Sequence, residues 1–253
     1  MRRAARALHL RQSAIDISRA SSQPGSRSSK RAAAVTTCLW LLSLLVVSTQ
    51  PIARAEGSTY SWTLLDTHNG VQLFTSHAAQ HSYDAVRGTS VIPVPAPRVI
   101  AALQAFEHYT AWYHNAAEVR VLLRPKTDAA ISFGADGSLA HVPQMGPWVL
   151  YIRQRAPHLE DRWALLRCEL RAGPSGSVMI EFRSLRREQS EHEGAVQMAL
   201  RGYWLVRPRG TTHTEVTFMV DVDPNTIVPA LFVDPELHAV VLQTLLNLRK
   251  HVS

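Results

Sequence analysis

The sequence predicts an α+β fold, in which a long C-terminal helix closes a curved antiparallel sheet around an apolar cavity. The evidence lies in the last third of the chain. Residues 200–206 and 214–222 alternate apolar and polar side chains, as expected of strands with one buried face. Residues 223–229 hold two prolines and end this pair of strands at a corner. Residues 235–250 then carry apolar side chains at helical spacing.

The positive charge of the chain belongs to its N-terminal end. The 253 residues have a net charge of +7, but residues 1–55 hold nine Lys and Arg and a single acidic residue, Asp16. The remainder holds 18 basic and 19 acidic residues. A nucleic-acid surface needs a basic stripe, so we expect no nucleic-acid partner for the folded part.

Residues 1–55 have the pattern of a signal peptide behind a disordered leader. A basic stretch ends at Arg31, an apolar run spans residues 32–47, and Ala53 and Ala55 suit cleavage before residue 56. The run is short for crossing a membrane, which takes about 20 residues. We expect a periplasmic or secreted protein after cleavage near Ala55. The alternative is a membrane anchor formed by the uncleaved signal.

Residues 56–253 are expected to form one domain. Ser58 is expected to begin a short helix that carries Trp62, Leu64 and Leu65. Asn69-Gly70 is a turn signal, and residues 71–75 and 84–92 follow as strands. A helix from Pro97 and a second short helix come next, with apolar positions at Val99, Leu103, Phe106, Tyr109, Trp112 and Tyr113.

The middle of the chain reads as a meander of strands with one apolar face. These strands span residues 119–124, 129–133, 148–154, 163–171, 177–182, 195–206 and 214–222. Alternation places Leu166 and Cys168 on the buried face and Trp163, Leu165 and Arg167 on the opposite face. Residues 186–194 are expected to form a charged loop.

The closing helix is predicted from Asp234 as N-cap and Pro235 as first residue. Its apolar stripe consists of Leu237, Val241, Leu245, Leu248 and Val252. A stripe of this length needs a large partner surface, and we expect that surface to be the concave face of the sheet.

No residue set for bond-making chemistry or for a cofactor emerges from the sequence. His77 and His81 lie in a loop-like stretch without the further ligands of a metal site. Asp221 and Asp223 lack the six to eight oxygen ligands that calcium takes. Cys168 is alone in residues 56–253, so we expect a buried filler rather than a disulfide. We therefore predict no catalytic residue, metal or cofactor.

Four stretches together resemble the START (steroidogenic acute regulatory protein-related lipid transfer) domain, a member of the helix-grip fold. They are Trp62 with residues 70–75, residues 109–112, residues 157–162, and residues 202–208 through 223–229. The resemblance covers residues 60–252 and implies a lipid held between the sheet and the terminal helix. One departure is the Arg-Asp pair of the family, which is Arg162-Trp163 here. No carboxylate matches the internal one of the steroid-transfer members, so the resemblance implies no sterol specificity.

The inward positions of these elements form the predicted lining of the cavity. Patterning alone does not separate a cavity from a solid core, because both need the same apolar residues; the resemblance favours a cavity. The expected lining residues are Trp112, Val121, Leu123, Leu166, Cys168, Ile180, Phe182, Trp204, Phe218, Val241 and Leu245.

The resulting hypothesis is an exported lipid-binding or lipid-transfer protein that acts as a monomer. Its expected partner is a hydrophobic small molecule or lipid, with transient membrane contact possible as the ligand enters. One alternative is an enzyme of the polyketide cyclase or aromatase type, with His141 or Tyr151 inside the cavity. Another is a module that binds a partner protein through Trp163 and the arginines of the outer face.

Overall fold

The computed structural model describes residues 60–77, 83–126, 129–157, 159–185 and 194–253. The predicted leader, Ser58, His81 and the charged loop at residues 186–193 lie outside the described residues.

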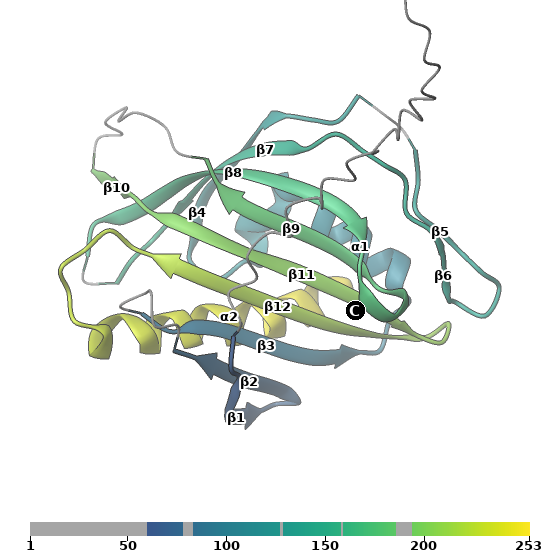
Figure 1. Ribbon diagram of the computed structural model, residues 1–253, viewed down its shortest axis with the longest axis horizontal. Helices are drawn as coiled ribbons and strands as arrows, with labels where there is room; N and C mark the ends of the chain where they lie inside the picture. The colour runs from purple at the N-terminus through teal and green to yellow at the C-terminus, as the bar shows by residue number, and fades with distance from the viewer. Residues whose placement is uncertain (1–59, 78–82, 127–128, 158, 186–193) are drawn as a thin grey trace, which may run out of the picture. The chain divides into compact units, whose positions relative to one another are not determined.

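A ten-stranded sheet forms the body of the domain (Figure 1). Along the sheet the order is β1-β2-β3-β12-β11-β9-β8-β7-β4, and neighbours in this order are antiparallel. The short β10 pairs in parallel with β8. The strands are β1 (Thr63–His68), β2 (Val71–Ser76), β3 (Ala85–Ile92), β4 (Ala116–Leu123), β7 (Trp148–Gln154), β8 (Asp161–Ala172), β9 (Val178–Ser184), β10 (Ala195–Gln197), β11 (Ala199–Arg209) and β12 (His213–Asp223).

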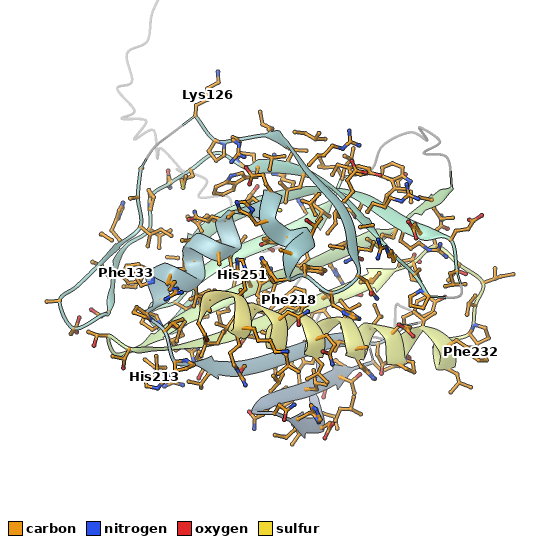
Figure 2. The ribbon with its side chains drawn as sticks, turned by 180° about the vertical axis from the view of Figure 1, so that it is seen from behind. Lys126, Phe133, His213, Phe218, Phe232 and His251 are labelled. Atoms are coloured by element: carbon orange, nitrogen blue, oxygen red, sulfur yellow. The ribbon has the colours of Figure 1, made fainter. Side chains whose placement is uncertain are left out.

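Helices cover one face of this sheet. They are α1 (Ala96–Gln104), the 3-10 helix η1 (Phe106–Ala111) and the C-terminal α2 (Ala230–Val252). Seen from behind, α1 and α2 lie in front of the sheet (Figure 2). A second 3-10 helix, η2 (Pro174–Gly176), joins β8 to β9, and β5 (Ser132–Phe133) pairs with β6 (Leu139–His141) as a separate ribbon. The predicted α+β class and the closing helix are confirmed.

The C-terminal half of α2 lies close against β3. At position 88 a glycine faces the helix, and a Cβ there would come within 2.5 Å of Leu245 Cδ1 and 2.7 Å of Val241 Cγ1. Four residues of the predicted stripe, Val241, Leu245, Leu248 and Val252, are buried at this contact. A side chain at Gly88 would therefore push α2 away from the sheet.

The predicted first helix is wrong, because its residues form an edge strand. Asn69 and Gly70 both have positive φ, 49° and 75°, which is the conformation of a tight two-residue hairpin. This turn folds residues 63–68 back along β2. Leu64 and Leu65 are exposed on the resulting β1.

The predicted start of the closing helix is also wrong. The helix begins at Ala230, after Pro229, and contains Pro235. Asp234 is not its N-cap; the Asp234 carboxylate accepts a hydrogen bond from the Asp84 backbone N–H at 3.2 Å. The first turn of α2 is thereby tied to the residue that precedes β3.

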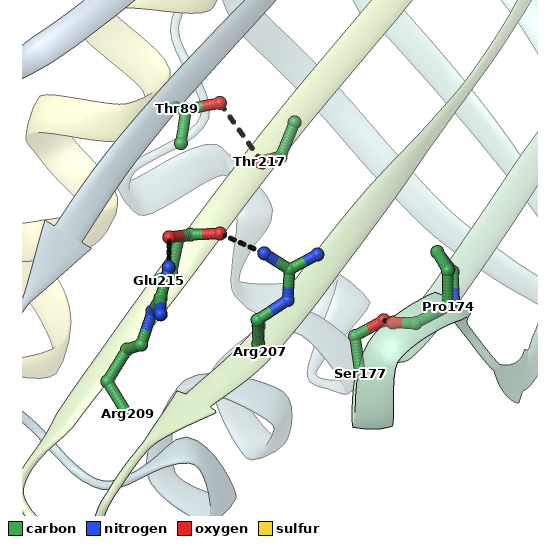
Figure 3. A network of polar contacts seen from close by, with 7 residues as sticks. All are labelled: Thr89, Pro174, Ser177, Arg207, Arg209, Glu215 and Thr217. Carbon is green, nitrogen blue, oxygen red and sulfur yellow. Dashed lines mark hydrogen bonds and ion pairs between the residues drawn. The ribbon is translucent and has the colours of Figure 1, made fainter.

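The outer face of the sheet carries ion pairs and a small apolar cluster. Glu215 on β12 pairs with Arg207 and Arg209 on β11 (Figure 3). Trp163 is buried on this face with Tyr151 and Leu165. Because Trp163 is buried, the hypothesis of a partner-binding surface centred on this residue is not supported.

Replacement of Gly88 by Ala is expected to weaken the helix-to-sheet contact. We expect the free energy of unfolding to fall by about 1–3 kcal/mol, the usual cost of overpacking a filled site, as measured by urea denaturation. The matched control is Gly146→Ala, where the nearest atom to a new Cβ would be 3.9 Å away. Equal stability of the two variants would contradict the close contact.

Candidate functional site

Two cavities of unequal size lie between the sheet and α2. The inner cavity has a volume of about 50 Å3 and the outer cavity about 640 Å3. They share wall residues, namely Gln154, Val222, Leu237 and Val240. Small-molecule sites usually measure about 300–1,000 Å3, so the outer cavity has the volume of such a site and the inner one does not.

Aromatic side chains fill most of the space under the C-terminal half of α2. The rings of Trp204 and Phe218 stack at 3.9 Å between centroids. Trp112 and Tyr113, from the segment after η1, pack against these two rings at 6.0 and 5.8 Å. Phe218 is seen between the sheet and α2 in Figure 2. This packing leaves only the small inner cavity in the region where the sequence predicted a large one.

The predicted lining residues therefore fall into separate groups. Those that line the inner cavity are Leu166, Cys168, Ile180, Phe182 and Trp204. Those that are buried in solid packing, outside either lining, are Trp112, Phe218, Val241 and Leu245.

The two predicted positions on β4 lie outside both linings. Val121 is half-buried and Leu123 is 50% exposed. The pairing of β4 with β7 shifts register between Val121 and Leu123, and such an irregularity interrupts the alternation of side chains. The expected inward direction of Leu123 is corrected on this ground.

The inner cavity has titratable side chains, but burial keeps them neutral. Burial raises the pKa of the Cys168 thiol to about 12 and raises the pKa values of Tyr109 and Tyr113. The Tyr109 hydroxyl donates to the Leu103 carbonyl oxygen at 2.7 Å. These groups can donate hydrogen bonds at neutral pH but carry no charge there.

The outer cavity lies at the open end of the domain, under the first turns of α2. Its lining comes from the end of β7, the β7–β8 loop, the start of β8, the corner after β12 and α2. The residues are Asn115, Gln154, Arg155, Ala156, Pro157, Leu159, Arg162, Met198, Val222, Pro224, Val228, Leu231, Phe232, Val233, Pro235, Glu236, Leu237 and Val240. Most are apolar, and Arg155, Arg162 and Glu236 supply the charges.

Hydrogen bonds to the corner hold the outer cavity in shape. The Tyr83 hydroxyl lies 3.0 Å from the Thr226 carbonyl oxygen and 2.9 Å from that of Val228. The Arg162 Nε donates to the Pro224 carbonyl oxygen at 2.8 Å. Both side chains thus fix the path of residues 224–228, which leads into the raised first turn of α2.

Exposed apolar side chains surround the mouth of the outer cavity. Leu231 is 77% exposed, Phe232 is 66% exposed, and Ile227 is fully exposed. Phe232 projects from the end of α2 that lies opposite His251 (Figure 2). No helix in the described part of the chain has the length and apolar character needed to cross a membrane.

The outer cavity was missed by the sequence reasoning, although one signal for it was present. The alternation that turns Leu166 and Cys168 inward also turns Arg162 inward, since it lies four and six residues before them on the same strand. The candidates named for an enzyme lie elsewhere: His141 is exposed on β6, and Tyr151 is buried on the outer face. Arg167 points outward, as predicted, and pairs with Glu169.

Comparison with known proteins identifies the fold of the domain. No family model matches the sequence. An uncharacterised protein of Pseudomonas aeruginosa is 23% identical over 189 residues, which cover 74% of this chain and 85% of that protein. The STAR-related lipid transfer protein of Xanthomonas axonopodis has a TM-score of 0.62 at 16% identity, over 76% of this chain and 98% of that one.

Two human structures give similar TM-scores and identities. StAR-related lipid transfer protein 5 has a TM-score of 0.60 at 14% identity, over 79% of this chain and 88% of that one. STARD10 has a TM-score of 0.59 at 16% identity, over 76% and 72%. These similarities, together with the ten-stranded sheet and the closing helix, show that this chain has a START-like helix-grip fold.

Proposed function

We propose that the domain binds one hydrophobic or amphipathic molecule, such as a lipid, in the outer cavity. The observation that carries this proposal is a cavity of about 640 Å3 with mostly apolar walls, set between the sheet and α2 of a START-like fold. Burial supplies the affinity, since each methylene removed from water contributes about 0.8 kcal/mol.

The inner cavity extends this site at its narrow end. Val222, Leu237 and Val240 belong to both walls together with the single polar residue Gln154, so a hydrocarbon chain that enters the outer cavity meets mainly apolar side chains on its way to the inner one. The inner cavity is too small to take a ligand alone. In this proposal it receives only the tip of the chain.

The ligand reaches the site through the mouth beside the first turns of α2. Leu231 and Phe232 combine exposure with a position in the lining of the outer cavity. Exposed apolar side chains around a cavity are typical of binding surfaces. We propose that they touch a membrane while the ligand moves, and that residues 1–55 direct the domain out of the cell, where this exchange takes place.

A large side chain on the wall shared by the two cavities is expected to weaken binding. A Val240→Trp substitution should lower the affinity for a fluorescent fatty-acid analogue about tenfold or more, which corresponds to about 1.4 kcal/mol, because the indole ring would occupy space that the ligand needs. Titration of the purified chain measures this, with Val91→Trp as control at an exposed position of β3. Absence of binding to the unaltered chain would contradict the proposed function itself, and equal binding by both variants would contradict its location.

Removal of the apolar rim is expected to slow exchange with a membrane. In a Leu231→Ser, Phe232→Ser chain, transfer of the same probe from phosphatidylcholine vesicles should be at least tenfold slower, because full insertion of each apolar side chain contributes about 1.5–3 kcal/mol and tenfold needs only about 1.4 kcal/mol. Stopped-flow fluorescence measures the rate. The matched control is Leu64→Ser, Leu65→Ser on the edge strand β1, where exposure is similar. Transfer slowed equally by both pairs would argue against contact at the mouth.

A further inference from the structure

Among the charged residues that line the outer cavity, Arg162 alone is buried, and the binding of an apolar molecule does not require it. Arg162 lies at the start of β8 on the inward phase of the strand, and only 7% of its surface is exposed. It lines the outer cavity beside apolar residues of the corner and of α2. A guanidinium stays protonated in proteins, so this wall carries a full positive charge.

The partners of Arg162 within the chain are neutral. Its Nε donates to the Pro224 carbonyl oxygen at 2.8 Å, and its Nη1 donates to the Glu160 carbonyl oxygen. Among the described residues no carboxylate lies within 4 Å of the guanidinium, and no hydrogen bond from Nη2 is present. Guanidinium groups have five N–H donors, so donors remain after the two carbonyl bonds.

Burial makes this arrangement costly unless an anion joins it. A charged group transferred from water into a poorly solvated site loses several kcal/mol of hydration free energy, which a neutral carbonyl offsets only in part. An oxyanion would restore the loss through charge-assisted hydrogen bonds, which are shorter and stronger than neutral ones. Arginine suits this purpose because its planar fork matches the oxygens of a carboxylate or phosphate.

The acidic residues near Arg162 do not serve as its counter-ion. Glu236 also lines the outer cavity, but it acts on His114: burial lowers the pKa of His114, and Glu236 opposes that shift. Asp234 accepts its hydrogen bond from the Asp84 backbone N–H. The side of the cavity next to Pro224 therefore combines a buried cation with open hydrogen-bond donors.

An apolar path leads from this cation toward the inner cavity. Met198, Val222 and Val240 line the outer cavity along with Arg162, and Val222 and Val240 continue into the inner cavity. A molecule that fills both regions would have a charged group at one end and a hydrocarbon chain at the other.

We infer that the ligand of the outer cavity is an amphiphile with an anionic headgroup, whose carboxylate or phosphate oxygens accept hydrogen bonds from Arg162. This inference rests on the proposed function, because it names the chemical class of the ligand for the same cavity. Arg162 is a ligand-binding residue in this assignment, and Arg155, exposed at the rim, adds only long-range attraction.

The direct test compares ligands that share a hydrocarbon chain and differ in the headgroup. Dodecanoate, dodecyl phosphate and dodecanol are titrated with the full chain by calorimetry, below the micelle-forming concentrations of the two anions and the solubility limit of the alcohol. We expect the two anions to bind roughly ten- to hundredfold more tightly than the alcohol, the range for hydrogen bonds to a charged group. The tighter of the two anions identifies a carboxylate or a phosphate as the preferred headgroup.

Variants then assign the preference to Arg162. Arg162→Gln keeps a donor for the corner carbonyl but loses the charge, so the anions should bind to this variant no more tightly than dodecanol does. Arg162→Lys should retain part of the preference. Arg155→Gln removes one positive charge at an exposed position of the same cavity and is the matched control, with the preference expected to remain.

The outcomes separate this inference from the proposed function. Binding of all three ligands with equal affinity to the unaltered chain would overturn the anionic headgroup and leave the apolar site in place. Binding of none would overturn the proposed function. A preference that persists in Arg162→Gln, or that disappears in Arg155→Gln, would overturn the role of Arg162. If Arg162→Gln does not fold, Arg162→Lys and the comparison of ligands on the unaltered chain still decide the question.

Discussion

The contact between α2 and the sheet differs between the two halves of the helix, and the position of the outer cavity depends on this difference. Its C-terminal half lies against β3 because Gly88 leaves room for Val241 and Leu245. The N-terminal half contains Pro235 and begins after the corner at residues 224–229. A helix that is pressed to the sheet at one end and raised at the other leaves its free space at the raised end, where the outer cavity lies.

The aromatic packing beside η1 makes the space under the C-terminal half of α2 differ from the space under its N-terminal half. Trp112 and Tyr113 pack against the rings of Trp204 and Phe218, which leaves only the small inner cavity at the pressed end of α2. Solid packing of this kind stabilises the fold and resists expansion. The raised end is held by hydrogen bonds to the corner from Tyr83 and Arg162. Polar contacts to a loop can be exchanged during ligand uptake with less disruption than a packed core.

Much of the fold was predictable from the sequence because burial of one sheet face leaves a two-residue period. The meander of strands was predicted on this basis, and the stripe Val241, Leu245, Leu248 and Val252 was predicted from its helical spacing of three and four residues; both are confirmed. The strand at residues 63–68 was missed, since its exposed leucines have no buried period and only the hairpin at Asn69-Gly70 defines it. The helix start was placed at Pro235 because proline is common in a first turn, whereas the helix extends one turn further back.

The position of the free space could not be predicted from the sequence. Filled and hollow interiors need the same apolar residues, and the difference here depends on how four aromatic rings pack. The irregular pairing of β4 with β7 likewise moved Leu123 to the surface without a mark in the sequence pattern. The inward direction of Arg162, by contrast, could have been predicted from the sequence, because strand alternation alone turns this side chain inward.

The most direct test of the account is to map where a hydrocarbon ligand lies. A fatty acid with a photoreactive diazirine on its chain can be bound to the full-length protein, irradiated, and its attachment sites identified by peptide mass spectrometry. The account predicts labelling of the lining of the outer cavity, in residues 222–240 of the corner and α2 and in the facing residues 154–162. Labelling confined to β1 or to the outer face of the sheet, with none in those segments, would contradict it.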